Sequence, residues 1–239
     1  MNGSLNNPIR SFTYEVGSKA IVDVDQAGIL RDFSYDIALY NVSVTNDLVP
    51  YRGGRFYLPV GSSQRIGAEI GTAFRFDHGL TLFATATISK NTYKNYMVDS
   101  LYTKASFDSS LIGKTANFSN NSMAGVPDMF ASARLRWVPD FFRQLSMEAE
   151  YRMVGRYFAD DANTVEVKSF SIVDANISID QPLFDNLSLR VMARMNNALN
   201  AKYMASVWIN PDRISNQAAF IEPGLPRNFA VNVALRYTL

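Results

Sequence analysis

The sequence has no cysteine and a single histidine, and no apolar run approaches the roughly 18 residues that a membrane-spanning helix needs. Without cysteine there can be no disulfide, no thiol chemistry and no cysteine-based zinc site. The histidine, His78, stands between Asp77 and Gly79, where a lone histidine is ordinarily a turn residue. We therefore expect no catalytic residues, no metal site and no cofactor, and we predict that the protein is not an enzyme.

Charge is also scarce, because Asp, Glu, Lys and Arg make up 19% of the 239 residues and the net charge is +1. This balance argues against nucleic acid as a partner. Aromatic residues reach 13%, which suits the aromatic girdle of an outer-membrane barrel or the core of an aromatic-rich soluble β-protein. Residues 1–4 have neither the basic nor the apolar region of a signal peptide. A barrel has to be exported, so we expect its N-terminal part to lie outside this sequence.

Hydrophobicity alternates with a period of two along most of the chain. At the C-terminus, Phe229, Val231, Val233 and Leu235 alternate with small or polar residues, and in a strand the two sets point to opposite faces. Similar alternation covers residues 12–20, 33–39, 65–75, 80–89, 131–137, 145–154, 173–180 and 187–196. We predict an all-β fold, an antiparallel up-and-down meander of about nine transmembrane strands, with a β-bulge near Tyr40.

The connections between these segments alternate in length. Short ones cover residues 23–31, 77–79, 139–144 and 181–186, and longer ones cover 49–63, 91–127, 159–168 and 201–226. Outer-membrane barrels have short periplasmic turns and longer extracellular loops, whereas a soluble sandwich has no reason to sort its loops by side. This alternation favours a barrel wall.

One face of the predicted sheet carries many charges. A small soluble barrel could not bury so many without close pairing, whereas the lumen of a wide barrel could hold them. The competing interpretation, a soluble sheet with one face in water, needs an amphipathic helix over its apolar face, and none is seen. Glu148 and Glu150 could form a carboxylate pair, but nearby arginines favour a role in lumen electrostatics. The candidates for facing the lumen or a plug are Arg65, Glu69, Arg134, Arg136, Glu148, Glu150, Arg152, Arg190, Arg194 and Arg236.

Several local patterns, in this order, resemble the C-terminal half of the TonB-dependent receptor family. They are residues 14–19 (YEVGSK), 36–40 (DIALY) followed by 46–50 (NDLVP), 65–69 (RIGAE), 125–127 (GVP), 197–200 (NALN) followed by Lys202 and Tyr203, and 223–228 (PGLPRN). Nothing in the chain resembles the N-terminal plug of that family. The chain ends in Leu239, where such barrels usually end in an aromatic residue.

The resemblance implies that residues 1–239 are the C-terminal portion of a larger barrel of the 22-strand type, without its plug domain. It also implies an active-transport receptor of the bacterial outer membrane that imports a ferric siderophore or a similar scarce nutrient. The expected partners are outer-membrane lipid, the TonB energy-transducing complex acting through the missing plug, a small-molecule metal chelate as substrate, and the barrel-assembly machinery.

The long loops are the expected contact surfaces for such a substrate. Aromatic rings and arginines suit an anionic, partly aromatic metal chelate through stacking and charge. The candidates for ligand contact are Arg52, Arg55, Tyr57, Tyr93, Tyr96, Tyr102, Trp208 and Arg213. The alternative is that several of these tyrosines belong to the aromatic girdle or pack the loops together.

Two other functions remain open on the sequence. The chain could belong to a passive outer-membrane pore or a small stand-alone barrel, which a signal peptide and an even number of strands in the parent gene would favour. It could also be a soluble β-rich binding protein, which would stay monomeric in buffer without detergent.

Overall fold

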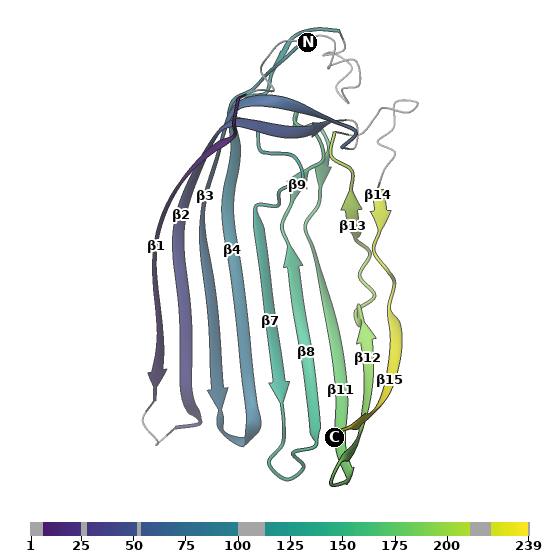
Figure 1. Cartoon of the computed structure of the whole chain (residues 1–239). Coiled ribbons are helices and arrows are strands. Elements are labelled where there is room, and N and C mark those ends of the chain that lie inside the picture. The colour runs from purple at the N-terminus through teal and green to yellow at the C-terminus, as the bar shows by residue number, and fades with distance from the viewer. Residues whose placement is uncertain (1–6, 25–27, 52–53, 100–112, 211–220, 239) are drawn as a thin grey trace.

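A computed structural model of the chain describes residues 7–24, 28–51, 54–99, 113–210 and 221–238. Within these residues nine strands form one antiparallel sheet, here called the main sheet, in the order β1-β2-β3-β4-β7-β8-β11-β12-β15. Each strand pairs with the one before it in the chain, and Figure 1 shows the resulting curved wall. The strands are β1 (Arg10–Asp23), β2 (Leu30–Tyr51), β3 (Phe56–Phe76), β4 (Leu80–Asn95), β7 (Met129–Trp137), β8 (Leu145–Val154), β11 (Phe170–Phe184), β12 (Leu187–Asn196) and β15 (Asn228–Tyr237). The predicted all-β meander is confirmed.

Three short strand pairs lie in the long connections. They are β5 (Met97–Val98) with β6 (Ala116–Asn117), β9 (Tyr157–Phe158) with β10 (Glu166–Val167), and β13 (Met204–Val207) with β14 (Ile221–Pro223). Helix in the described residues is limited to one 3-10 turn, η2 (Asp77–Gly79). None of the described residues forms a helix long and apolar enough to cross a membrane.

The register sorts side chains into two faces. One continuous cross-strand row runs Leu82, Leu135, Ala149, Ala175, Met195 and Phe229. The row beside it runs Thr81, Arg136, Glu148, Asn176, Arg194 and Ala230. Because neighbouring residues of a strand point to opposite sides, the main sheet has one apolar face and one polar face. The apolar face carries Val231, Val233 and Leu235, as the alternation at the C-terminus predicts, together with Val191, Ile177, Met147, Leu135 and Leu82.

The predicted bulge near Tyr40 is wrong. The pairing of β2 with β3 runs without interruption from Asp32 to Thr45. Tyr40 lies opposite Gly67, and a Cβ atom at Gly67 would lie 2.5 Å from the Tyr40 hydroxyl. Tyr40 is therefore an aromatic residue on the polar face that covers a glycine, and this covering disturbs the alternation without disturbing the register.

The two ends of the main sheet differ, and we call them the short-turn end and the long-loop end. At the short-turn end, Gly79 has a φ of +75°, and a Cβ atom there would clash with the Val138 carbonyl oxygen. Trp137 Nε1 donates a hydrogen bond of 3.0 Å to the His78 carbonyl. His78 thus lies in a turn, as the sequence predicts, and the geometry of that turn requires the glycine after it.

At the long-loop end, the predicted loop over residues 49–63 is mostly strand. β2 and β3 continue to Tyr51 and Phe56, and Figure 1 shows them bending across the end of the main sheet. Asn46, within β2, has a φ of +56°. At Gly61 a Cβ atom would lie 2.8 Å from the Asn95 amide nitrogen. The hairpin bends where Asn46, with its left-handed backbone conformation, lies across from Gly61, a position that has no room for a side chain.

A hydrophobic cluster lies under this bent hairpin and not in the wall. Its buried members are Val49, Leu58, Val60, Tyr93, Tyr96, Val98, Ala116, Phe118 and Met123. We call the described residues 47–60, 91–99, 113–126 and 157–167, which carry or surround this cluster, the loop cap. The apolar face of the main sheet, in contrast, is largely exposed, with Phe229, Val231 and Val233 all above 60%. A second medium has to cover that face.

The two faces predict opposite responses to charge at neighbouring positions. In a lipid bilayer, arginine at Val233 on the apolar face should lower folding stability by about 2–4 kcal/mol, and arginine at Asn232 by far less. The measurement is denaturant-dependent folding of the full-length protein into lipid vesicles, followed by heat-modifiable migration on gels. Equal losses at the two positions would contradict the assignment of faces.

Candidate functional site

The polar face gathers all ten of the charged residues that the sequence analysis selected for it. In β3 these are Arg65 and Glu69, and across the sheet the register aligns Arg134 with Glu150 and Arg136 with Glu148. The pairing of β12 with β11 and β15 puts Arg190, Arg194 and Arg236 on the same side. The sheet therefore brings together charges that lie up to 171 positions apart, from Arg65 to Arg236.

Asp174 of β11 is the centre of an ionic network on this face. Its side chain is 6% exposed, and Oδ2 lies 2.6 Å from Arg152 and 3.4 Å from Arg194. The backbone N–H of Asn197 donates to Oδ1 at 2.8 Å. Two guanidinium groups and a backbone donor satisfy the buried carboxylate. The network fixes the point where β12 ends and the last long connection begins.

Asn197 then organises that connection. Its amide donates to the carbonyl oxygens of Ala201 and Leu225, and its Oδ1 accepts from the Ala201 N–H. Asn197 has a φ of +48°, which asparagine tolerates better than most residues. The NALN motif is thus a turn that places the following segment against the polar face.

Other charges on the polar face have weaker or no partners. Arg134 lies over the Phe83 ring at 4.9 Å, and Arg136 is 3.6 Å from Glu148. Within the part of the chain that the structure describes, Glu69, Glu150 and Arg236 form no ion pair. Their charges remain available to a further element facing this side of the sheet.

A hollow of about 470 Å³ opens on the polar face near the long-loop end, and we call it the polar-face hollow. The sheet supplies its polar groups from Thr85, Thr87, Ser132 and Arg152. Tyr203, which follows the Asn197 turn, forms part of the wall and stacks on Phe170 with ring centroids 4.7 Å apart. Hydroxyls, a guanidinium and aromatic rings at one place suit an anionic ligand with a planar part.

Tyr93 and Tyr96, two of the ligand-contact candidates, have a different role in the structure. Each is 1% exposed and they pack edge to face, with centroids 4.8 Å apart. Both belong to the hydrophobic cluster of the loop cap. Here the packing alternative applies, since a ligand outside the cap cannot reach either ring.

Both tyrosine hydroxyls donate hydrogen bonds to the carboxylate of Asp161, which lies in the turn between β9 and β10. Tyr93 Oη donates to Oδ1 at 2.6 Å, and Tyr96 Oη donates to Oδ2 at 2.8 Å. Asn210 donates to Oδ2 as well and accepts a bond from the Asp161 N–H. Asn121 donates to the Asp161 carbonyl at 2.8 Å. One aspartate therefore joins four segments that are distant in sequence.

The hydrogen bonds around Asp161 and Asn210 also include the bent hairpin. Asn210 donates through its other amide hydrogen to the Pro50 carbonyl at 2.9 Å. Next to it, Asp160 accepts bonds from Thr164 and Val165, and Asn163 exchanges hydrogen bonds with the Ser122 backbone. Every long connection with described residues thus contributes to one hydrogen-bonded structure.

Burial has an electrostatic consequence at Asp161. Desolvation raises the pKa of the Asp161 carboxyl to about 6, although the hydrogen bonds from Tyr93, Tyr96 and Asn210 lower it. The neighbouring carboxylate of Asp160 adds to the increase. A carboxyl with a pKa near 6 changes its charge at mildly acidic pH.

Asp161 and Asn210 are not among the residues predicted from the sequence to have a functional role. Two adjacent aspartates in a polar connection look like a solvated turn, and an isolated asparagine before a proline looks like a turn as well. No local pattern distinguishes a buried hydrogen-bond acceptor from an exposed one, because its donors lie 49 to 68 residues away.

The remaining ligand-contact candidates lie at the surface or outside the described residues. Arg55 and Tyr57 are exposed on the bent hairpin, and Trp208 is 41% exposed beside Asn210. Arg52, Tyr102 and Arg213 fall outside the described residues. Among described residues no three His, Asp or Glu side chains are close enough to share a metal ion.

Comparisons with known proteins give a consistent result. A family model described as TonB dependent receptor-like, beta-barrel, matches residues 1–198. The chain is 25% identical over 209 residues to the ferrichrome outer membrane transporter/phage receptor of Escherichia coli (strain K12), covering 87% of this chain and 25% of that protein. It is 25% identical over 180 residues to the ferrioxamine receptor of Yersinia enterocolitica, covering 73% of this chain and 22% of that protein.

Solved structures show the same fold. The ferric yersiniabactin uptake receptor FyuA from Yersinia pestis superposes with a TM-score of 0.66 at 14% identity. That superposition covers 97% of this chain and 30% of that structure. The chain therefore spans about a quarter of the length of the curated relatives it matches.

Removing the Asp161 carboxylate should open the loop cap. In Asp161→Ala the hydroxyls of Tyr93 and Tyr96 would stay buried without an acceptor, at about 1–3 kcal/mol for each unsatisfied group. Hydrogen exchange of the full-length protein should then show faster exchange over residues 91–98 and 157–167. Asp140→Ala, at the exposed short-turn end, is the control and should leave these residues protected.

The raised pKa predicts the direction of the pH dependence. Because the folded carboxyl binds a proton below about pH 6 and the unfolded one only below its ordinary value near 3.8, the folded cap binds more protons between these limits. Its stability should rise as pH falls from about 6 toward 4, and above pH 7 this group should cause no further change of stability with pH. Hydrogen exchange at pH 5 and 7, corrected for intrinsic rates, tests this. Asp161→Asn should remove the difference, and a difference that survives in Asp161→Asn comes from another group.

Proposed function

This chain belongs to the TonB-dependent receptor-like β-barrel family of bacterial outer-membrane transport proteins, and on that premise we propose that it forms part of the wall of a siderophore receptor. We propose that residues 1–239 are the C-terminal portion of a barrel of the 22-strand type. The plug and the other strands would be supplied by the rest of that protein. The observation that carries the proposal is the family match over residues 1–198. In the structure, the strands of this region belong to a sheet with one apolar and one polar face.

The dimensions of the strands support a place in the membrane. β7, β8, β12 and β15 have 9 or 10 residues each, close to the 9–11 residues that a tilted strand needs to cross a bilayer. β1 and β15 each pair with one neighbour in the described sheet. Open edges are unfavourable in hydrocarbon because their backbone groups lack partners, so further strands would pair at both edges to close the barrel.

The polar face would line the lumen and contact the plug. Asp174 and its two arginines would keep the wall rigid, whereas the unpaired charges of Glu69, Glu150 and Arg236 would meet complementary groups on the plug. The plug would also link the receptor to the TonB complex, which supplies the energy for transport. Insertion would depend on the barrel-assembly machinery and on outer-membrane lipid.

The substrate class is proposed from the named relatives and from the exposed side chains. The two curated relatives are named for ferrichrome and ferrioxamine. Arg55, Tyr57 and Trp208 on the outside of the loop cap, with Arg52, Tyr102 and Arg213 as further candidates, would make the first contact. The polar-face hollow with Arg152 and Tyr203 lies below the cap and would offer a second contact site inside the barrel.

Transport assays in cells test this function. A strain lacking the full-length gene should lose uptake of one iron-labelled chelate from a panel that includes ferrichrome and ferrioxamine, and the gene should restore it. Uptake should stop when TonB is absent or when the proton gradient is dissipated. Uptake that persists without TonB would instead indicate a passive pore.

A single exposed ring tests the proposed contact surface. Tyr57→Ala should weaken chelate binding about two- to tenfold, because an aromatic contact contributes about 0.5–1.5 kcal/mol beyond its buried area. Phe141→Ala, which removes an exposed ring at the short-turn end, is the matched control and should bind normally. Unchanged binding in Tyr57→Ala would remove this residue from the contact surface.

A further inference from the structure

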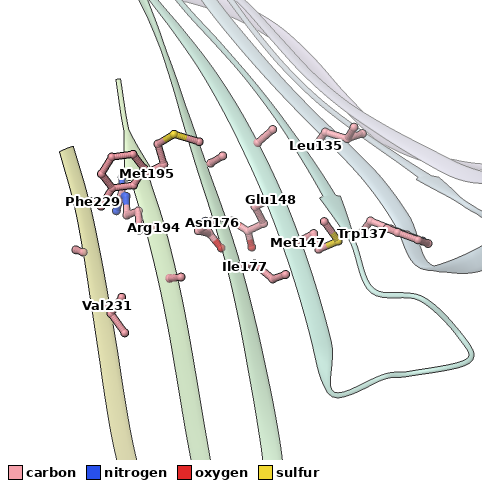
Figure 2. A pocket seen from close by; sticks show the side chains of 14 residues that line it. Leu135, Trp137, Met147, Glu148, Asn176, Ile177, Arg194, Met195, Phe229 and Val231 are labelled. Carbon is pink, nitrogen blue, oxygen red and sulfur yellow. Dashed lines mark hydrogen bonds between the residues drawn. The ribbon is translucent and has the colours of Figure 1, made fainter. Parts of the chain in front are cut away.

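The apolar face of the main sheet is not smooth. A hollow of about 620 Å³, which we call the apolar-face hollow, spans β7, β8, β11, β12 and β15. Figure 2 shows the side chains around it, with Trp137 at one side and Phe229 at the other. Its floor contains Ala149, Ala175 and Ala193. The hollow therefore has a wall of large side chains around a floor of small ones.

The register gives the hollow an apolar lining. Leu135, Ala149, Ala175, Met195 and Phe229 form one cross-strand row on the apolar face, and Trp137, Met147, Ile177, Ala193 and Val231 form the next. The intervening residues Glu148, Asn176 and Arg194 point to the polar face. These three residues also contribute to the lining of the hollow, but their place in the register directs their charged or polar groups to the other face of the sheet. Methionine side chains at two positions allow the lining to adapt to a flexible chain.

The location restricts what can fill this hollow. The apolar face of an outer-membrane barrel faces lipid, so the surrounding medium is hydrocarbon and not water. A methylene group takes up about as much space as a water molecule in the liquid, roughly 30 Å³, so the volume of the hollow matches one acyl chain. We propose that the apolar-face hollow binds an acyl chain of one phospholipid, which stays with the protein when bulk lipid exchanges. This site is independent of the nutrient that the receptor transports.

The residues at the short-turn end of the hollow favour a phospholipid from the membrane leaflet on that side of the barrel. Trp137 donates its indole N–H to the His78 carbonyl, and its ring lines the hollow. Phe141 packs edge to face on Trp137 at 6.3 Å and is 83% exposed. Aromatic residues of this kind mark the level of the lipid head groups. The acyl chain would enter the hollow beside this pair.

A positive charge lies in the same turn. Arg143 is 3.7 Å from Asp140, yet its side chain is 80% exposed. An exposed guanidinium can meet a phosphate oxygen without leaving a buried partner unpaired. The head group of the bound lipid would therefore lie at residues 138–144, with its chain running from Trp137 toward Phe229.

Photocrosslinking tests the chain-binding part. The full-length protein is placed in vesicles of phosphatidylethanolamine and phosphatidylglycerol that contain a phospholipid with a diazirine on one acyl chain, and crosslinked peptides are identified by mass spectrometry. Labelling should concentrate on residues 147–149, 175–177 and 193–195, several-fold above apolar-face residues of β2 to β4. Ala193→Trp, which fills the floor, should abolish this excess. Ala86→Trp, on the same face but outside the hollow, should leave it intact.

Heat-modifiable migration confirms that each variant is folded before labelling is compared. Labelling that is spread uniformly over the apolar face would overturn the proposal, as would equal labelling of Ala193→Trp and the parent. Arg143→Gln tests the head-group part and should reduce labelling by the phospholipid but not by an uncharged diazirine alkane. If both probes label Arg143→Gln as strongly as the parent, the hollow binds hydrocarbon without recognising a phosphate, which overturns the assignment to a phospholipid.

Discussion

The strand register is the constraint on which the rest of the structure depends. Side chains alternate between the two faces, so a slip of one residue in any strand would move its charges onto the apolar face. In β8 such a slip would expose Glu148, Glu150 and Arg152 to lipid and turn Met147 and Tyr151 toward the charges of β11. The ionic network around Asp174 and the charge alignment between β7 and β8 form only in the native register. The electrostatics of one face and the lipid contact of the other are therefore determined together.

The wall and the loop cap are stabilised by different interactions. The wall has little buried core of its own in the described residues, and it relies on backbone pairing and on the medium against its apolar face. The cap is built like a small soluble domain, with packed aromatic rings, a satisfied buried carboxylate and the core of the chain's described part. This division explains why the same aromatic residues serve such different purposes. Tyr93 is inaccessible in the cap, whereas Trp137 lines a hollow open to hydrocarbon.

The wall could be predicted from the sequence because its determinants are local. Alternation in residues 187–196 and 228–237 is enough to define two strands and their faces, and the short connections identify their hairpins. The role of Tyr40 could not be predicted because its partner Gly67 is 27 positions away, and only the pairing of β2 with β3 shows that the aromatic ring covers a glycine. The length of the bent hairpin was underestimated for a related reason. Residues 49–63 contain two prolines and three glycines, which normally mark a loop, but tertiary packing of Val49, Leu58 and Val60 keeps them in strand form.

The convergence on Asp161 has a consequence for engineering these loops. Its donors come from β4, from the connection before β7 and from Asn210, and Asn210 also binds Pro50, which is 160 positions earlier in the chain. Grafting a single loop from another receptor would remove one of the segments that share hydrogen bonds around Asp161. The remaining segments would then keep buried polar groups without partners. A functional transplant has to carry the hairpin, both tyrosines, the turn at Asp161 and Asn210 as one cassette. Natural recombination between members of this family would meet the same requirement, because an exchanged segment would have to bring its hydrogen-bond partners with it.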